Sequence, residues 1–343
     1  MKENNKKNLI IVVAVLLVVA ITVLVVLNLE DKEVKIFEPE GNVDIVASLS
    51  GESQNEIDTQ IKEDLKENKY KLANAKVYIN PYGKTPLSAL IVFASDKETD
   101  VTVTVKGKNG DDLVLKSGKA KEHFVPVYGL YAGYENTVEV TLGTGEKKTV
   151  TIKTDDIEGK PDSTVNLANA SNDGIYFLTS PLAMTSFAVD GHGEVRWVVD
   201  DLYYHSIEVL ENGHILIGTD KVNDDSQYTK IIEIDYLGRL YNEYEIEDGY
   251  LNAFFLKEDG NLIIPSKKSD RKTYSDYIIE VDRSTGKIVK TWDVLETILQ
   301  VDENYKSKIT SDNYFYNSGV EYYPESDSLV LTYWGGEFVI NLS

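Results

Sequence analysis

The chain has no cysteine among its 343 residues and only four histidines. Without cysteine, disulfides, thiolate nucleophiles, iron–sulfur clusters and cysteine-ligated zinc are excluded. The histidines lie apart in the sequence, so we expect neither a histidine-built metal site nor a cofactor. His123 fits a strand edge, and His192 and His214 flank glycine turns, where solvated side chains are usual. His205, in "YYHSIEVLENGHILIG", is the candidate that needs a functional explanation.

Basic residues are fewer than acidic residues. The chain has 35 Lys and Arg and 57 Asp and Glu, which gives a net charge of −22. A nucleic-acid partner is excluded, because a phosphate backbone requires a basic face. The same excess of acid opposes docking on an anionic lipid surface. The expected partners are therefore neutral, cationic or small molecules.

One long apolar run stands at the N-terminus. Residues Leu9 to Leu27 contain no charge, and at 1.5 Å per residue they span roughly 28 Å, enough for a hydrocarbon core. Lysines precede the run and acidic residues follow it, which favours an inside N-terminus. We therefore predict a signal anchor helix over residues 1–29, in the cell membrane, with the bulk of the chain extracellular. A cleaved signal peptide is the alternative, although no A-x-A-like site follows the run.

Residues 30–69 form an acidic spacer that holds the only convincing soluble helix. Ile57, Ile61 and Leu65 recur at every fourth position, which predicts a helix from about Gln54 to Tyr70. Such a helix would either pack under the following domain or space that domain from the membrane.

Residues 70–155 are predicted to form short strands. Seven segments between Ala75 and Thr154 alternate apolar and polar residues and are separated by Gly, Asn and Asp turns. Seven short strands in about 80 residues indicate an antiparallel β-sandwich. Residues 156–168 are polar, contain Gly and Pro, and are interpreted as a linker.

Residues 169–343 repeat two motifs. In the first, an apolar strand ends in an aspartate before a glycine turn; these aspartates are Asp190, Asp235 and Asp282, spaced by 45 and 47 residues. The second is a hairpin with the turns "ENGH", "EDGN" and "ESDS". Two hairpins at this period are typical of a four-stranded propeller blade. The predicted fold class is therefore all-β: an anchor helix, a β-sandwich and a partial β-propeller.

The C-terminal "GGEFVINLS" begins another copy of the first motif, with Asn341 in place of the aspartate. About three blades are present, whereas a closed ring needs at least four, and an open ring leaves unpaired strand edges. We expect the chain to be a fragment; pairing with another chain and a degenerate cap are the alternatives.

Two segments resemble the bacterial aryl-sulfate sulfotransferase family. "INPYGKTPLSALIVFAS", with "HFVPVYGLYAGYENTVEV", is similar to the family's N-terminal β-sandwich, and "HSIEVLENGHILIG" is similar to its six-bladed propeller. The resemblance implies transfer of a sulfuryl group from a phenolic sulfate ester to another phenol, through a sulfated histidine. Imidazole suits this role because it both attacks and leaves well.

The resemblance assigns roles only in part. It implies that His205 binds the sulfate rather than attacking it. The family's second signature has a histidine and an arginine where this chain has Tyr316 and Trp334, and the covalent histidine would lie in a blade beyond Ser343. Arg196 and Trp197 recur in the family, and we interpret them as packing residues.

Aromatic side chains around these positions allow two interpretations. Tyr203, Tyr204 and Phe315 could line a cleft for a phenol or could be ordinary sheet aromatics. Three functional hypotheses therefore stay open: a sulfotransferase that acts on aryl sulfates, a non-catalytic binding module, and a scaffold in which the sandwich pairs two chains as a homodimer.

Overall fold

The structure is a computed structural model that describes residues 43–45, 54–108, 112–157, 174–180, 185–199, 205–219, 228–251, 254–268 and 271–342. These ranges contain twenty β-strands and two α-helices, so the predicted all-β class is confirmed for them. The anchor predicted over residues 1–29 lies outside the described residues. Within the described ranges, no helix is both long enough and apolar enough to cross a membrane.

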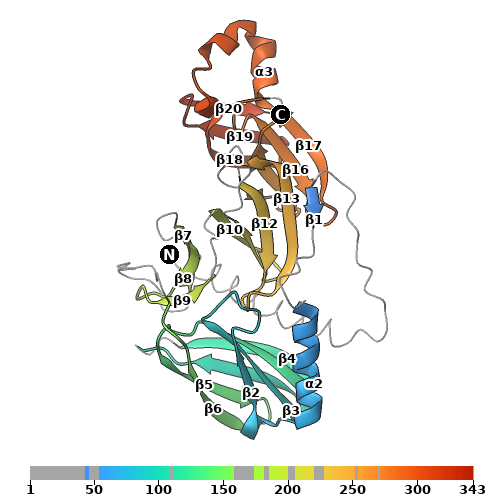
Figure 1. Cartoon of the computed structure of the whole chain (residues 1–343), viewed down its shortest axis with the longest axis vertical. Helices are drawn as coiled ribbons and strands as arrows, with labels where there is room; N and C mark the ends of the chain where they lie inside the picture. The colour runs from blue at the N-terminus through green and yellow to red at the C-terminus, as the bar shows by residue number, and fades with distance from the viewer. Residues whose placement is uncertain are drawn as a thin grey trace.

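Five antiparallel strands form the N-terminal sheet, which occupies the lower part of Figure 1. They are β2 (Lys76–Ile79), β3 (Ser88–Val105), β4 (Leu113–Tyr128), β5 (Glu135–Leu142) and β6 (Lys147–Lys153), and a short 3-10 helix, η1 (Leu72–Asn74), precedes them. The order is β2-β3-β5-β6, with β4 paired to β3.

The sequence predicted seven short strands here, and the structure corrects this number to five. The predicted strands on either side of the polar stretch 96–99 are one continuous strand, β3, and β4 likewise joins two predicted strands. The chain stays extended across this stretch because β3 keeps its pairing with β4, with Thr99 opposite Ala120 and register shifts on both sides of Thr99. Such a bulge absorbs an irregular stretch without ending the strand.

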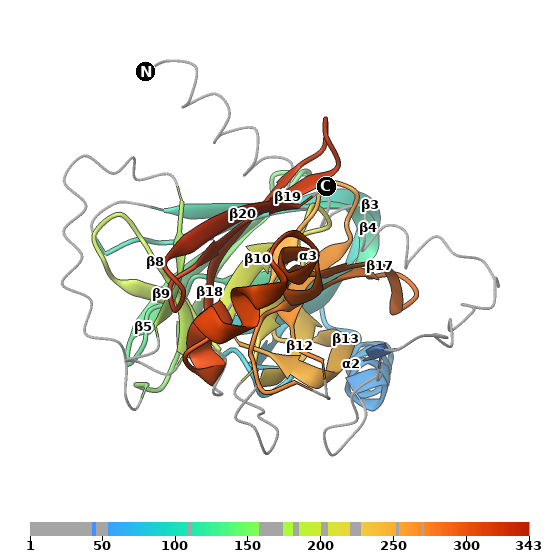
Figure 2. The same cartoon turned by 90° about the horizontal axis from the view of Figure 1, so that it is seen from above.

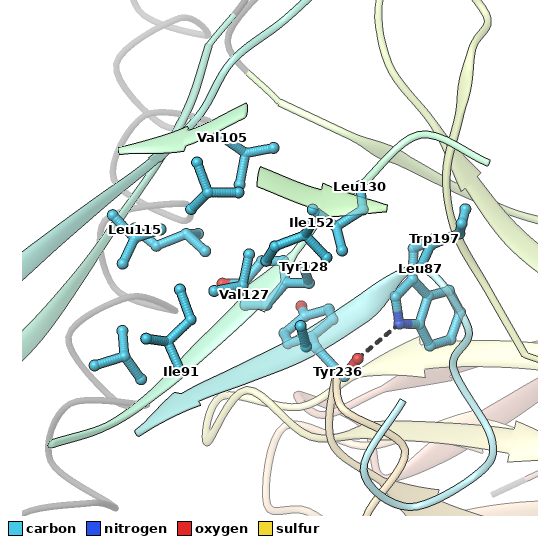
Figure 3. Packing of buried hydrophobic residues seen from close by; sticks show 14 of the residues in the cluster. Leu87, Ile91, Val105, Leu115, Val127, Tyr128, Leu130, Ile152, Trp197 and Tyr236 are labelled. Carbon is cyan, nitrogen blue, oxygen red and sulfur yellow. Dashed lines mark hydrogen bonds between the residues drawn. The ribbon is translucent and has the colours of Figure 1, made fainter. Parts of the chain in front are cut away.

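The core of this sheet continues into the later hairpins. Alternate residues of β3, Val101, Val103 and Val105, are buried, as the period of two predicts. Figure 3 shows how side chains of the sheet meet Trp197 and Tyr236 from the C-terminal half. The indole Nε1 of Trp197 donates a hydrogen bond to the carbonyl of Tyr236 at 3.0 Å. The two halves therefore share one hydrophobic core.

Helix α2 (Gln54–Asn68) confirms the predicted amphipathic helix. The helix lies beside strands β3 and β4 of the N-terminal sheet in Figure 1. From its apolar stripe, Ile61 and Leu65 are buried beside Leu90 of β3. Burying one such side chain stabilises the fold by about 1.5–3 kcal/mol. The helix ends where Lys69 turns into the left-handed region, with φ 51°. Of the two roles considered, packing on the sheet is the one observed.

The C-terminal half consists almost entirely of hairpins. A three-stranded sheet contains β7 (Tyr176–Ser180), β8 (Thr185–Val189) and β9 (Val195–Val198). A nine-stranded sheet contains β10 (His205–Val209), β11 (Ile215–Gly218), β12 (Tyr228–Ile234), β13 (Leu240–Tyr250), β14 (Phe255–Leu256), β15 (Leu262–Ser266), β16 (Tyr277–Asp282) and β17 (Lys287–Asp293), with β1 at the β13 edge. A last sheet contains β18 (Asn317–Tyr323), β19 (Ser328–Tyr333) and β20 (Phe338–Leu342).

Apart from β1, the nine-stranded sheet divides into two groups of four strands. Strands β10 to β13 are paired in sequence order, and β14 to β17 follow the same pattern. The groups are joined through a single residue pair, Tyr250 opposite Ser266. Figure 2 looks down on the opposite end of the molecule from the N-terminal sheet, with α3 and strands β18 to β20 nearest the viewer.

Two parts of the fold were not predicted. Strand β1 (Val43–Ile45), in the supposed spacer, pairs antiparallel with β13. Helix α3 (Val294–Val301), followed by the 3-10 helices η2 (Glu303–Lys308) and η3 (Asp312–Phe315), interrupts the hairpins. Asp293 caps α3 by accepting a hydrogen bond from the amide of Glu296 at 2.9 Å. Asp293 followed three residues later by Glu296 is a helix-start signal that could have revealed α3.

The packing of α2 gives a stability prediction. Leu65→Ala should lower the free energy of unfolding by about 2–4 kcal/mol, because it leaves a cavity under the helix. Urea titration followed by circular dichroism measures this change. Lys66→Ala is the matched control, since Lys66 is exposed on the same turn. Equal midpoints for the two variants would contradict the packing described.

Candidate functional site

Strand β10 begins at His205 with an irregular backbone. His205 pairs with Gly218, and the register shifts before Ile207 pairs with Ile217. The intervening Ser206 has φ 48°, a strained conformation for a residue with a side chain. Bulges of this kind redirect neighbouring side chains and occur often beside functional sites. The side chain of His205 lies outside the described residues, as do Tyr203 and Tyr204.

The C-terminal hairpin has a register shift at the same place. Asn317 pairs with Tyr333, the register shifts, and Gly319 then pairs with Thr332. Asn317 therefore holds the place in β18 that His205 holds in β10, and Tyr316 directly precedes it. Asn317 is buried, and its amide donates to the carbonyl of Gly319 at 3.1 Å.

The structure brings Tyr316 and Trp334 together. The amide of Trp334 donates to the carbonyl of Tyr316 at 2.9 Å, and the ring centroids are 6.1 Å apart in an edge-to-face arrangement. Trp334 is 72% exposed. Phe315 differs, because it is completely buried among Tyr314, Tyr333 and Phe338. Phe315 therefore packs in the core and does not line an open cleft.

The repeated aspartates close the turns that follow them. The Oδ1 atom of Asp235 accepts hydrogen bonds from the amides of Leu237 and Arg239, both at 2.9 Å. Asp190 holds its turn in the same way, and Asp282 accepts from the amide of Ser284 at 2.9 Å. The recurrence of aspartate at this position therefore has a structural cause.

A buried arginine connects the N-terminal sheet to the first hairpin sheet. Arg196 is fully buried, and its Nε atom donates to the carbonyl of Gly129 at 2.7 Å. Its Nη1 atom donates to Asp190 at 3.0 Å and to the hydroxyl of Tyr131 at 2.9 Å. The guanidinium lies 3.9 Å from the centroid of the Tyr131 ring. Arg196 is thus a packing residue, as interpreted from the sequence.

The histidines outside β10 have different environments. His192 is exposed in its turn, as predicted. His123 lies inside β4, an outer strand that pairs with β3, and not at the end of a strand. It is 3% exposed and stacks on Phe93, and its burial lowers its pKa to about 4. His214 was expected to be solvated, and this prediction was wrong. It is 9% exposed because its Nδ1 atom lies 2.6 Å from the buried carboxylate of Glu233.

Glu233 is held by four side chains. Besides His214, its carboxylate accepts hydrogen bonds from Asn242 at 2.9 Å, Tyr244 at 3.1 Å and Arg283 at 2.8 Å. Burial alone would raise the pKa of Glu233, but these donors outweigh burial and lower its pKa to about 2.

The next repeat contains a counterpart of this arrangement. There Asn261 follows the turn as His214 does, and its amide donates to the buried Glu280 at 2.7 Å. The bond between a turn residue and a buried glutamate is therefore a repeated structural feature, and histidine replaces asparagine in one copy.

A pocket of about 300 Å³ lies beside His214. We call it the junction pocket, because helix α2, the N-terminal sheet and two hairpin turns all contribute to it. Its lining comprises Asp58, Ile61, Lys62, Tyr82, Leu90, Phe124, Pro126, Tyr128, Asn212, Gly213, His214, Asp235, Tyr236, Leu237, Arg239 and Tyr241. No pattern in the sequence indicates this pocket, because its residues come from five separate segments.

Charged groups at the junction pocket are largely paired. Arg239 donates through Nε and Nη2 to Asp58, each at 3.1 Å. The hydroxyl of Tyr82 donates to the same carboxylate at 2.6 Å. Among the described ranges, no three His, Asp or Glu side chains gather as a metal site would require.

The fold and these hairpins define an all-β protein with an N-terminal sheet followed by repeated hairpin units. Residues 162–343 match the family model described as arylsulfotransferase, and residues 76–156 match the arylsulfotransferase Ig-like domain. The chain belongs to the arylsulfotransferase family, which confirms the resemblance seen in its motifs.

Two curated relatives are similar to this chain. It is 24% identical over 294 residues to the arylsulfate sulfotransferase AssT of Lelliottia amnigena, and 22% identical over 294 residues to that of Escherichia coli O6:H1. Each match covers 65% of this chain and 49% of the relative. The chain thus spans about half the length of the curated relatives it matches.

The environment of Glu233 gives a pH prediction. A carboxyl whose folded pKa is about 2, against an ordinary 4.5, stabilises the fold fully above pH 4.5, and this contribution is lost as the pH falls towards 2. The wild type should therefore lose roughly 2 kcal/mol more stability than Glu233→Gln between pH 6 and pH 3. Urea unfolding at both pH values measures the difference. Glu258→Gln, at an exposed turn, should keep the wild-type pH dependence, and the same dependence in Glu233→Gln would contradict the assignment.

Proposed function

We propose that this chain acts in sulfuryl transfer between a phenolic sulfate ester and a phenol. The observation that carries the proposal is the arylsulfotransferase match over residues 162–343. Both relatives are named arylsulfate sulfotransferases. The composition agrees with a small-molecule partner, since a net charge of −22 disfavours polyanions.

His205 is proposed to bind the sulfate group. A sulfuryl group carries negative charge on its oxygens, and that charge must be offset before a nucleophile approaches the sulfur. An imidazolium can donate a hydrogen bond to such an oxygen and can also protonate the departing phenolate. The bulge at Ser206 supports this role, because it changes the direction of the backbone immediately after His205. Tyr203 and Tyr204 stay predicted neighbours of the phenol ring.

The architecture proposed for this activity is a β-sandwich over 70–155, a linker over 156–168 and a partial propeller over 169–343. Strands β10 to β13 and β14 to β17 would be two propeller blades. The single residue pair that joins the two groups supports this division, since blades of a propeller are separate sheets. We also propose that residues 1–29 anchor the chain in the cell membrane with its bulk outside; the uncharged run from Leu9 to Leu27 supports this.

A second candidate function is a non-catalytic binding module. The observation in its favour is the pair of Tyr316 and Trp334, which stands where the family signature has histidine and arginine. An exposed indole beside a phenol ring can hold an aromatic ligand by stacking but cannot neutralise a sulfate. This candidate predicts ligand binding without turnover.

Release of 4-nitrophenol from 4-nitrophenyl sulfate, with phenol as acceptor, tests the proposal. His205→Ala should lower the turnover by about 10²–10³-fold, as expected when a donor to the developing charge is removed. His192→Ala is the control and should keep the wild-type rate, because His192 is exposed in a turn. Unchanged turnover in His205→Ala would remove His205 from the mechanism. Binding of the ester without any turnover would favour the binding module.

A further inference from the structure

A lysine, an asparagine and a glutamate converge at the turn between β14 and β15. Lys257 and Asn261 face each other across this turn, since the amide of Lys257 donates to the carbonyl of Asn261 at 2.9 Å. The Nζ atom of Lys257 and the Nδ2 atom of Asn261 each lie 2.7 Å from Oε1 of Glu280. The two nitrogen atoms therefore share one carboxylate oxygen and are at most twice 2.7 Å, or 5.4 Å, apart.

The hairpin does not need a lysine at this position. In the preceding repeat Leu210 occupies it: its amide donates to the carbonyl of His214 at 2.8 Å, and its carbonyl accepts from the amide of Gly213 at 2.9 Å. There the turn residue His214 contacts Glu233, and a leucine takes the place of the lysine. Lys257 is thus an addition to a repeated arrangement, and it brings an amine next to a carboxamide.

The amine and the carboxylate are largely shielded from water. Lys257 is 9% exposed and Glu280 is 4% exposed. The ring of Tyr322, which belongs to the last sheet, lies over the amine, with its centroid 4.5 Å from Nζ. Burial disfavours the charged forms of both groups, so it lowers the cost of moving the proton from Nζ to the carboxylate.

A second carboxylate also contacts Lys257. Asp259, within the turn, lies 3.1 Å from Nζ, and its side chain is 53% exposed. Burial alone would lower the pKa of Lys257, but hydrogen bonds to Glu280 and Asp259 outweigh burial and raise this pKa. Lys257 therefore rests as an ammonium, and its proton must leave before the amine can attack. Glu280 is within hydrogen-bond distance of that proton, as a general base must be.

We propose that Lys257 and Asn261 become joined by an amide bond between their side chains, with Glu280 as the acid–base group. Glu280 takes a proton from Nζ, and the neutral amine attacks Cγ of Asn261. The Nζ–Cγ bond forms and the Cγ–Nδ2 bond breaks. The departing nitrogen takes the proton from Glu280 and leaves as ammonia, while Glu280 receives a second proton from Nζ and passes it to the ammonia. The products are a secondary amide and ammonium.

This step needs no oxidant, reductant or cofactor, because an amine displaces ammonia from a carboxamide. The new bond would link the two sides of the turn 258–260 covalently, so that a cut in this exposed turn would not separate them. The inference stands without the proposed sulfuryl transfer, because it rests on the contacts of Glu280 alone.

Intact mass spectrometry of the purified full chain tests the proposal. The wild type should have a mass about 17 Da below that of its sequence, which is the mass of the ammonia released. Lys257→Arg and Glu280→Gln should both keep the full sequence mass, with circular dichroism to verify that they fold. Lys268→Arg is the matched control and should keep the loss, since Lys268 is paired with Asp293 at the other end of β15. The same loss in Lys257→Arg or Glu280→Gln would contradict the proposal.

Peptide mapping distinguishes the amide from another reaction of the same mass. Asn212 precedes a glycine, and such an asparagine loses ammonia when it cyclises on its own backbone. A glutamate-specific protease cuts after Glu258, within the turn. The amide should keep the fragments that contain Lys257 and Asn261 joined after this cut. The proposal is overturned if the wild type has its full sequence mass, if the loss maps to Asn212, or if the two fragments separate.

Discussion

The arrangement of the two halves depends on the buried guanidinium of Arg196. It joins the carbonyl of Gly129 and the ring of Tyr131, at the end of the N-terminal sheet, to Asp190 in the first hairpin turn. A buried charge is tolerated only when its partners are in place, so these contacts must form together. The core then continues past Trp197 to Tyr236. In the same turn between β12 and β13, Arg239 binds Asp58 of α2. The junction pocket is a consequence of this docking.

Local features of the fold could be predicted from the sequence. The spacing of Asp190, Asp235 and Asp282 correctly predicted three turns. Each aspartate accepts hydrogen bonds from backbone amides two to four residues later, so the interaction is local in the sequence. The helix at Ile61 and Leu65 followed from its own periodicity. Features that depend on distant partners were missed. The polar middle of β3 looks like a turn until Thr99 is paired with Ala120.

The same reasoning explains the candidate site. A turn histidine such as His214 is normally solvated, and only the position of Glu233, nineteen residues later, makes it buried. The motif around His205 was enough to predict that this residue lies at the start of a strand. That Asn317 occupies the corresponding position in β18 could be seen only from the pairing registers of the two strands. The junction pocket could not be predicted, since no single stretch of sequence contains more than one of its walls.

The central claim is that this chain takes part in sulfuryl transfer between phenols. Transfer can be distinguished from hydrolysis by mass spectrometry, with 4-nitrophenyl sulfate as donor and 2-naphthol as acceptor incubated with the full chain. The account predicts that 2-naphthyl sulfate accumulates as 4-nitrophenol is released. Absence of the sulfated acceptor, or its replacement by free sulfate, would contradict the account.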